Sequence, residues 1–445
     1  MGISYAQTAN LLFALAALMI AAHLGGQVFA RFRQPRVIGE IFGGFLLGPS
    51  CLGMLFPGIE AALFPSTDGV TLPVLGAVYQ LGLMLLMFCS GLEIRASFDR
   101  RERRTAGYAA AFGTVLPFVL GVAAILASRQ SGSAFLDAGR FIGSAGSETA
   151  FLLVFAIAIS VTSIPVISRI LTDLDLLDTS LARVVLAAAV VEDILLYVLL
   201  AVAVGLVGAV ASDGGHGLSA LLGLAPGTGS SLLYHSLAPV LFIAASLAFG
   251  PRLLARLRRP PLQLPVRAGP TAFLMTFLLL VTAFCLFLGV TPIFGAFVAG
   301  LVVGTRLDEL SPAREAIKQF SFAFFVPIYF ALVGFRLDLL AEFDAGYFLL
   351  FFGFACAVKT ASVWLGARAA GEPNDKATDI AVAMNARGGP GIVLASVALE
   401  SGIIAAGFFN QLVLLSVLTS LLAGIYLERI ARARYRPVTP AVCEP

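Results

Sequence analysis

Charge is scarce in this chain. Only 12% of its 445 residues are Asp, Glu, Lys or Arg, whereas 59% are hydrophobic. A soluble globular domain has about 25% charged residues, so this composition excludes an ordinary soluble protein and fits a polytopic membrane protein. The formal net charge of +3 says little about partners. We expect membrane lipid around the protein and no nucleic-acid partner.

Motifs for metal binding and catalysis are also missing. The five cysteines show no CxxC or Cys/His spacing, so neither a zinc site nor a disulfide framework is expected. There is no Walker A motif, no GxGxxG after a strand and no nucleophile triad, which leaves ATP-driven work and covalent catalysis without support. We therefore expect neither an enzyme nor a cofactor. The first apolar run, Leu11 to Ala22, lacks the flanks of a signal peptide and predicts a retained span.

Long apolar segments dominate what is present. Thirteen segments approach the length of about 20 residues that crosses a bilayer as a helix, although several are short or interrupted. The predicted fold is an all-α polytopic membrane protein. The expected centres lie near residues 20, 46, 82, 117, 160, 195, 241, 280, 299, 328, 356, 389 and 417.

The basic residues indicate an orientation. If the segments alternate across the membrane, 24 of the 29 basic residues fall in one set of connections and only Arg129, Arg140 and Arg336 in the other. The positive-inside bias then places the N-terminus outside and the C-terminus in the cytoplasm. The last two basic residues, Lys359 and Arg387, lie inside apolar segments.

Two halves of the chain resemble each other. Glu40 to Gly48 reads EIFGGFLLG, and Pro292 to Gly300 reads PIFGAFVAG. Polar, Pro or Gly interruptions occur at 162–165 and again at 388–391. Both pairs are seven segments apart. Because seven is odd, the second copy enters the membrane from the other side, which predicts two inverted-topology repeats. Paired interrupted spans at corresponding positions indicate the midplane site of a transporter.

The interruptions predict broken helices. Pro165 lacks a backbone donor and disfavours a helical residue before it, and Gly-Gly-Pro-Gly is a poor helix interior. Unwound backbone at membrane depth persists only when it is buried in protein or lines a wet cavity, where its ends can face an ion. Thr162 and Ser163 add hydroxyl oxygens at the first break. A single proline kink in a structural helix is the alternative, which the second break disfavours.

Two neighbouring carboxylates stand near the middle of the span Val184 to Leu200. Ionisable groups at that depth mark a pathway or a binding site, unless they form a structural salt bridge. Adjacent helical residues point about 100° apart, so Glu192 and Asp193 cannot serve the same face. One carboxylate can bind either a proton or a metal cation, which would couple their movements.

Two buried cations are the candidate charge partners. Lys359 is one of only three lysines, and a buried lysine, unlike arginine, can lose its proton. We expect Lys359 to pair with an acid, and Glu192, which points elsewhere on the helix than Asp193, is the expected partner. Arg387, beside the second break, is expected to stay charged and to compensate half-helix carbonyls or an acid.

Several stretches carry a resemblance to a known family. The chain is similar to the monovalent cation:proton antiporters, specifically their second family, which includes bacterial sodium/proton, Kef-type potassium/proton and plant cation/proton exchangers. The resemblance covers nearly all of the first 430 residues. The strongest stretches are QPRVIGEIFGGFLLGPS (Gln34 to Ser50), LGLMLLMFCSGLEI (Leu81 to Ile94), VTSIPVISRILTDL (Val161 to Leu174), VVEDILL (Val190 to Leu196) and MNARGGPGIVLA (Met384 to Ala395).

The resemblance implies a homodimer with two broken helices crossing in a moving core. Asp193 matches the essential ion- and proton-binding aspartate, Thr162 and Ser163 the polar break beside it, and Lys359 the basic partner of an acid. The expected division is 1–100 and 271–340 for the dimerisation helices of the two repeats, 101–230 and 341–430 for their core helices, 231–270 for a linker helix and basic cytoplasmic loop, and 431–445 for a short tail.

Two departures from the family pattern matter. The residue before the aspartate is Asp, Asn or Gln in typical members and Glu192 here, which leaves stoichiometry and ion preference open. Kef-type proteins carry a cytosolic nucleotide-binding domain, which we do not expect here because about fifteen residues follow the last expected span.

The predicted function is a secondary sodium/proton antiporter, with lithium also possible, that works by alternating access in a bacterial inner membrane. A cation and a proton would compete for Asp193, and the presence of Glu192 and Lys359 favours electrogenic exchange. Alternatives are a potassium/proton (Kef-like) exchanger and an organic-anion carrier on a related inverted-repeat fold. A receptor or channel is disfavoured by the repeat and its paired breaks.

Overall fold

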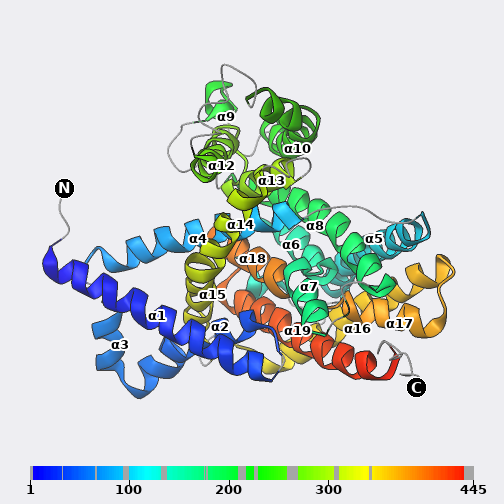
Figure 1. The fold of residues 1–445 in the computed structure, drawn as a ribbon, viewed down its shortest axis with the longest axis horizontal. Coiled ribbons are helices and arrows are strands. Elements are labelled where there is room, and N and C mark those ends of the chain that lie inside the picture. Colours follow the sequence, from blue (N-terminus) through cyan, green and yellow to red (C-terminus); the bar gives the residue numbers. More distant parts are fainter. Residues whose placement is uncertain are drawn as a thin grey trace, which may run out of the picture.

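Helices make up the regular structure of the computed structural model (Figure 1). In the residues that it describes there is no β-strand, only an isolated bridge between Ile142 and Ile404. The basic stretch after residue 257 and most of the expected tail lie outside the described residues. These are 4–32, 34–65, 68–93, 100–131, 138–174, 176, 179–208, 217–224, 229–257, 269–304, 310–339 and 343–434.

The helices of the first half run from the N-terminus to the middle of the chain, and those of the second half follow after residue 217. The first-half helices are α1 (Tyr5–Arg31), α2 (Arg36–Leu47), α3 (Pro57–Leu63), α4 (Thr71–Glu93), α5 (Arg100–Ser131), α6 (Glu148–Ser160), α7 (Ile164–Asp173) and α8 (Ser180–Leu206). The second-half helices are α9 (Leu218–Leu221), α10 (Gly229–Leu257), α12 (Pro270–Phe287), α13 (Pro292–Gly304), α14 (Ser311–Phe320), α15 (Val326–Phe335), α16 (Ala345–Ala369), α17 (Asn374–Ala383), α18 (Gly388–Glu400) and α19 (Ala406–Arg434).

Many of these segments are long and apolar enough to cross a bilayer. Ten candidate spans of 18 or more residues occur among the described residues, and α6 and α13 are shorter apolar helices. A π-helical turn, Ser321–Phe325, joins α14 to α15 as one such span. The prediction of an all-α polytopic membrane protein is therefore confirmed. The number of thirteen spans remains a prediction, because several segments are shorter than a bilayer requires.

Side-chain caps fix where the helices that carry the buried charges begin. Thr179 accepts a hydrogen bond from the backbone N–H of Ala182 at 3.2 Å and starts α8. Asp344 accepts one from the backbone N–H of Tyr347 at 2.9 Å and starts α16. That bond, together with a hydrogen bond from Arg140, lowers the pKa of the exposed Asp344 carboxyl. Both caps satisfy backbone donors that a helix start leaves without partners.

The helices pack in two groups. One group holds α1, α2, α4, α13 and α15, in which α1 and α15 pack on α2, and α4 packs on α13. The other holds α5 to α8 and α16 to α19, in which α5 packs on α6, α8 and α16, and α18 on α19. Figure 1 shows α1 toward one end of the molecule and α16 and α17 toward the other. Helix α10 contacts both groups, through α8 and α13.

The packing of the first group reproduces the internal repeat. Gly48 of the first repeat motif and Gly300 of the second occupy equivalent positions. Gly48 meets the backbone of Phe335 at the end of α15, and Gly300 meets the backbone of Phe88 in α4. The first motif therefore packs on α15 of the second half, and the second motif packs on α4 of the first half. Such crossings use small residues because helix backbones in a membrane approach closely only without side chains between them.

Replacing Gly91 of α4 by Ala should destabilise the protein. A Cβ at Gly91 would overlap the backbone of Phe297, and backbone cannot move aside as a flexible side chain can. Overpacking of this kind costs about 1–3 kcal/mol. The melting temperature in detergent should fall for Gly91→Ala. It should stay unchanged or rise for the matched control Gly76→Ala on the same helix, where a Cβ meets open space. Equal melting temperatures for the two variants would contradict this packing.

Candidate ion-binding site

The two predicted breaks are present. Helix α6 ends at Ser160, and α7 begins at Ile164, with Val161 extended between them. Helix α17 ends at Ala383, and α18 begins at Gly388. Gly388 has a φ of +28°, in the region that favours glycine, and a Cβ there would overlap the side chain of Val166 in α7. The second break therefore requires glycine where it approaches the first.

The breaks are joined to each other. The Thr162 hydroxyl donates a hydrogen bond to the carbonyl of Met384 at 2.6 Å, and the backbone N–H of Ser163 donates to the carbonyl of Ala386 at 2.6 Å. The Ser163 hydroxyl accepts a bond from the N–H of Val166 at 3.3 Å. The structure thus places the two predicted hydroxyls at the crossing, where they satisfy backbone groups that the breaks leave without helical partners.

Arg387 lies fully buried at the crossing. Its guanidinium donates hydrogen bonds to the carbonyls of Ala158 and Ile159 at 3.1 Å each, near the end of α6. It also donates to the carbonyl of Ala355 in α16 at 2.9 Å and to the side-chain oxygen of Asn385 at 2.7 Å. The positive charge stands against the negative end of a half-helix. The structure places Arg387 on half-helix carbonyls, one of its two expected roles.

Lys359 and Glu192 form a buried ion pair. The Lys359 Nζ lies 2.8 and 2.9 Å from the two Glu192 carboxylate oxygens, and both side chains have no exposed surface. The ammonium also donates to the carbonyls of Ser160 at 2.6 Å and Gly113 at 2.9 Å. Glu192 is therefore the acid that the structure brings to Lys359. A buried ion pair persists when additional hydrogen bonds of this kind satisfy the charges.

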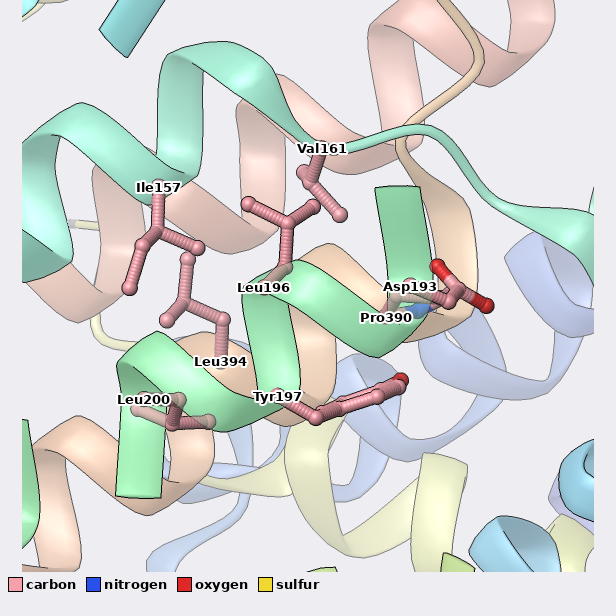
Figure 2. Close-up of a pocket in the computed structure, with 8 residues that line it drawn as sticks. All are labelled: Ile157, Val161, Asp193, Leu196, Tyr197, Leu200, Pro390 and Leu394. Carbon is pink, nitrogen blue, oxygen red and sulfur yellow. The ribbon is translucent and has the colours of Figure 1, made fainter. Parts of the chain in front are cut away.

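Asp193 lies in different surroundings. Its side chain is 1% exposed, yet neither carboxylate oxygen has a hydrogen-bond partner among the described residues. The carboxylate lines a cavity of about 10 Å³, roughly the room that one water molecule needs. Figure 2 shows the other lining residues, which are Ile157, Val161, Leu196, Tyr197, Leu200, Pro390 and Leu394. Burying a polar group without a hydrogen-bond partner costs free energy, and a ligand bound in the cavity would compensate this cost.

A second, larger cavity opens between α4, α7, α8 and α14. Its volume is about 500 Å³, and its lining includes Arg183, Leu186 and Val190 of α8 and Arg314 and Lys318 of α14. The three basic residues in this lining are among the 24 that the sequence places in one set of connections. Along α8 the lining thus extends from Arg183 to Val190, three residues before Asp193.

Two residues of the site were missed at the level of sequence. Asn385 orients Arg387 through its side-chain oxygen and donates to the carbonyl of Cys356 at 3.3 Å. Tyr197 shares the small cavity with Asp193. Its spacing of four residues from Asp193 could have revealed it, because residues at i and i+4 share a helix face. No cluster of three or more metal-ligating side chains occurs in the described part of the chain.

Comparisons with known proteins identify the family. The family model described as "Sodium/hydrogen exchanger, transmembrane" matches residues 15–433. The chain belongs to the sodium/hydrogen exchanger family. The resemblance to monovalent cation:proton antiporters is thereby confirmed, and this family is one of transporters.

Relatives of this sodium/hydrogen exchanger family member include proteins named for different cations. The chain is 29% identical over 437 residues to the Na(+)/H(+) antiporter NhaS4 of Synechocystis sp., which covers 95% of this chain and 98% of that protein. It is 30% identical over 433 residues to the K(+)/H(+) antiporter 1 of Saccharomyces cerevisiae, which covers 96% of this chain but only 47% of that protein. The sequence thus spans about half the length of some curated relatives.

A solved structure has the same fold. The sodium proton antiporter MjNhaP1 from Methanocaldococcus jannaschii superposes with a TM-score of 0.64, over 95% of this chain and 99% of that one. At 15% sequence identity, the likeness to this exchanger concerns the fold alone.

Proposed function

We propose that the protein is a secondary sodium/proton antiporter, with lithium as a second substrate, in which the cation and the proton compete for Asp193. The observation that carries this proposal is the carboxylate of Asp193, buried without a hydrogen-bond partner beside a cavity of about 10 Å³. A proton or a monovalent cation would each compensate the buried charge. Because one carboxylate cannot hold both well, binding of either favours release of the other.

The rest of the site supports a single exchanging acid. Glu192 is occupied by Lys359, and Arg387 is occupied by carbonyls. These charges are compensated by partners at the crossing, whereas the Asp193 carboxylate has no hydrogen-bond partner among the described residues and lines the cavity. Lys359, paired with Glu192, is a further buried group that could release a proton when a cation arrives. We therefore propose electrogenic exchange.

Alternating access, orientation and assembly belong to the same proposal. The large cavity on the arginine-rich side would be the cytoplasmic entrance, since that side is expected to face the cytoplasm of a bacterial inner membrane. The group α5 to α8 with α16 to α19 would move as the core against the group that contains α1, α2, α4, α13 and α15. The group that contains α1 would also form the homodimer contact, as α1 exposes large apolar side chains including Leu12, Phe13 and Ile20.

Reconstituted flux under a clamped membrane potential tests the proposal. Proteoliposomes that contain the protein should release protons on addition of Na⁺ or Li⁺ and show little response to K⁺. The clamp separates electrogenic from electroneutral exchange, because only the former responds to the potential. A response to K⁺ alone would replace this function by potassium/proton exchange, which the similarity to the yeast K(+)/H(+) antiporter keeps as the second candidate. The absence of any alkali-cation response would contradict both.

An organic-anion carrier has less support. The family match is to exchangers of sodium and hydrogen ions, and an organic anion would not fit a cavity of about 10 Å³ beside a carboxylate. Such a carrier would ignore alkali cations in the same assay and respond only to its solute.

A further inference from the structure

One face of α8 lines both the large cavity and the small one. Arg183, Leu186 and Val190 line the large cavity, and Asp193, Tyr197 and Leu200 line the small one. Successive members of this set are three or four residues apart, so they form a single stripe along the helix. Glu192 lies off the stripe and faces Lys359 instead. The residues of this stripe therefore follow one another along α8 from the large cavity to the small one.

Tyr197 stands directly beyond Asp193 on this stripe. At 1.5 Å per residue, it lies about 6 Å further along α8, away from the arginine-rich end. In Figure 2, Asp193 and Tyr197 extend from successive turns of α8 with their oxygen atoms toward the same side. On this face of α8, the phenol is thus the next side chain beyond Asp193 that lines the small cavity.

The ring of Tyr197 spans the boundary between the two helix groups. Its centroid lies 4.9 Å from the ring centroid of Phe297 in α13, at an interplanar angle of 48°. Tyr197 is 5% exposed, and Phe297 is fully buried. Helix α13 is held in its own group by the close packing of Phe297 backbone against Gly91 of α4. The contact between the rings is therefore a contact between α8, which carries the site, and the group that would stay fixed.

We propose that Tyr197 is a positioning residue that closes the far side of the Asp193 site by packing its ring against Phe297. The inference rests on the proposed antiport and adds the barrier that alternating access needs. An antiporter couples two ions only if its site is never open to both sides at once. Sliding of α8 along α13 would carry the ring away from Phe297 and open the far side.

Side-specific thiol labelling tests this barrier without relying on transport. Asp193→Cys, in a background where the five native cysteines are replaced, is exposed from either face of oriented vesicles to Ag⁺, a thiol-reactive cation small enough for the cavity. The readout is the ratio of the labelling rate from the far side to that from the arginine-rich side. We expect Tyr197→Ala to raise this ratio at least about tenfold and Tyr197→Phe, which keeps the ring, to leave it within twofold. Phe297→Ala should raise it as Tyr197→Ala does.

Controls separate a barrier from general destabilisation. Phe351→Ala removes a fully buried ring from α16, away from the stripe, and should lower the melting temperature without changing the ratio. Tyr197→Leu replaces Tyr197→Ala if the latter does not fold, and should raise the ratio by a smaller factor. A ratio within twofold of the parent for folded Tyr197→Ala (or Tyr197→Leu) and Phe297→Ala would overturn the inference. Since labelling needs no transport, a failed flux assay would leave this result interpretable.

Discussion

Asp193→Asn should abolish cation-dependent proton release. An amide neither ionises nor balances the charge of a bound cation, so neither of the two competing ligands would be held at the cavity. We expect release to fall about 100-fold or more, to the level of protein-free liposomes, because an ionisable group at this depth is required for the exchange. The measurement is proton release on addition of Na⁺ or Li⁺, with each variant reconstituted at equal density.

Asp68→Asn provides the matched control for this neutralisation. Hydrogen bonds from Thr71 hold the pKa of the half-buried Asp68 carboxyl at about 2. Asp68 therefore stays ionised throughout the range in which antiport is measured, and its replacement removes a charge without removing a titrating group. Antiport should be unchanged in this variant. Full activity in Asp193→Asn would contradict competition of the cation and the proton for the Asp193 carboxylate, even if the wild-type protein proved to be an antiporter.

Lys359→Ala should have the second largest effect, on both stability and coupling. It leaves Glu192 in a fully buried position without its ammonium partner. Breaking a buried ion pair by removing one partner costs about 3–5 kcal/mol, so the melting temperature should drop clearly. The pH dependence of antiport should also change, and the response to membrane potential should weaken, because the second group that can release a proton is gone.

The double variant Glu192→Leu with Lys359→Met separates these two effects. Replacing both partners by apolar residues of similar size removes the uncompensated charge, and such replacements are often neutral for stability. The double variant should therefore recover most of the melting temperature lost in Lys359→Ala, but not its response to potential. An unchanged pH profile in Lys359→Ala would show that this lysine does not titrate during transport.

The breaks and the buried charges were predictable from the sequence because each is a local departure from an apolar pattern. Pro165 and the Gly-Gly-Pro-Gly run after Arg387 disfavour a continuous helix, and they lie at the starts of the half-helices α7 and α18. A charge inside a membrane span needs a partner of opposite charge. Only two basic residues of the sequence lie inside apolar segments, and this small number indicated Lys359 as the partner of an acid. The separation of Glu192 from Asp193 followed from helix geometry, and the structure shows which of the two meets the lysine.

The remaining features depend on contacts between distant segments, which no local pattern encodes. The cavity at Asp193 is bounded by residues of α6, α8 and α18. Its size depends on how the breaks cross, through bonds such as the one from Thr162 to Met384. Tyr197 reads as one more aromatic residue in an apolar helix until Phe297 is placed opposite it. Thr162 and Ser163 were expected near the ion, and their roles as ion ligands stay predictions.

The crossed packing of the repeat motifs has a consequence for biogenesis. Helix α2 packs Gly39 and Gly43 on α1 of its own half, but it packs Gly44 and Gly48 on α15 of the other half. During synthesis α2 enters the membrane long before α15 exists, so the face that carries Gly44 and Gly48 stays in lipid until the ribosome has passed Phe335. A nascent chain of this kind is exposed to premature association and quality-control proteolysis for most of its translation. Maturation would then depend on how fast the second half emerges as well as on how stable the finished protein is.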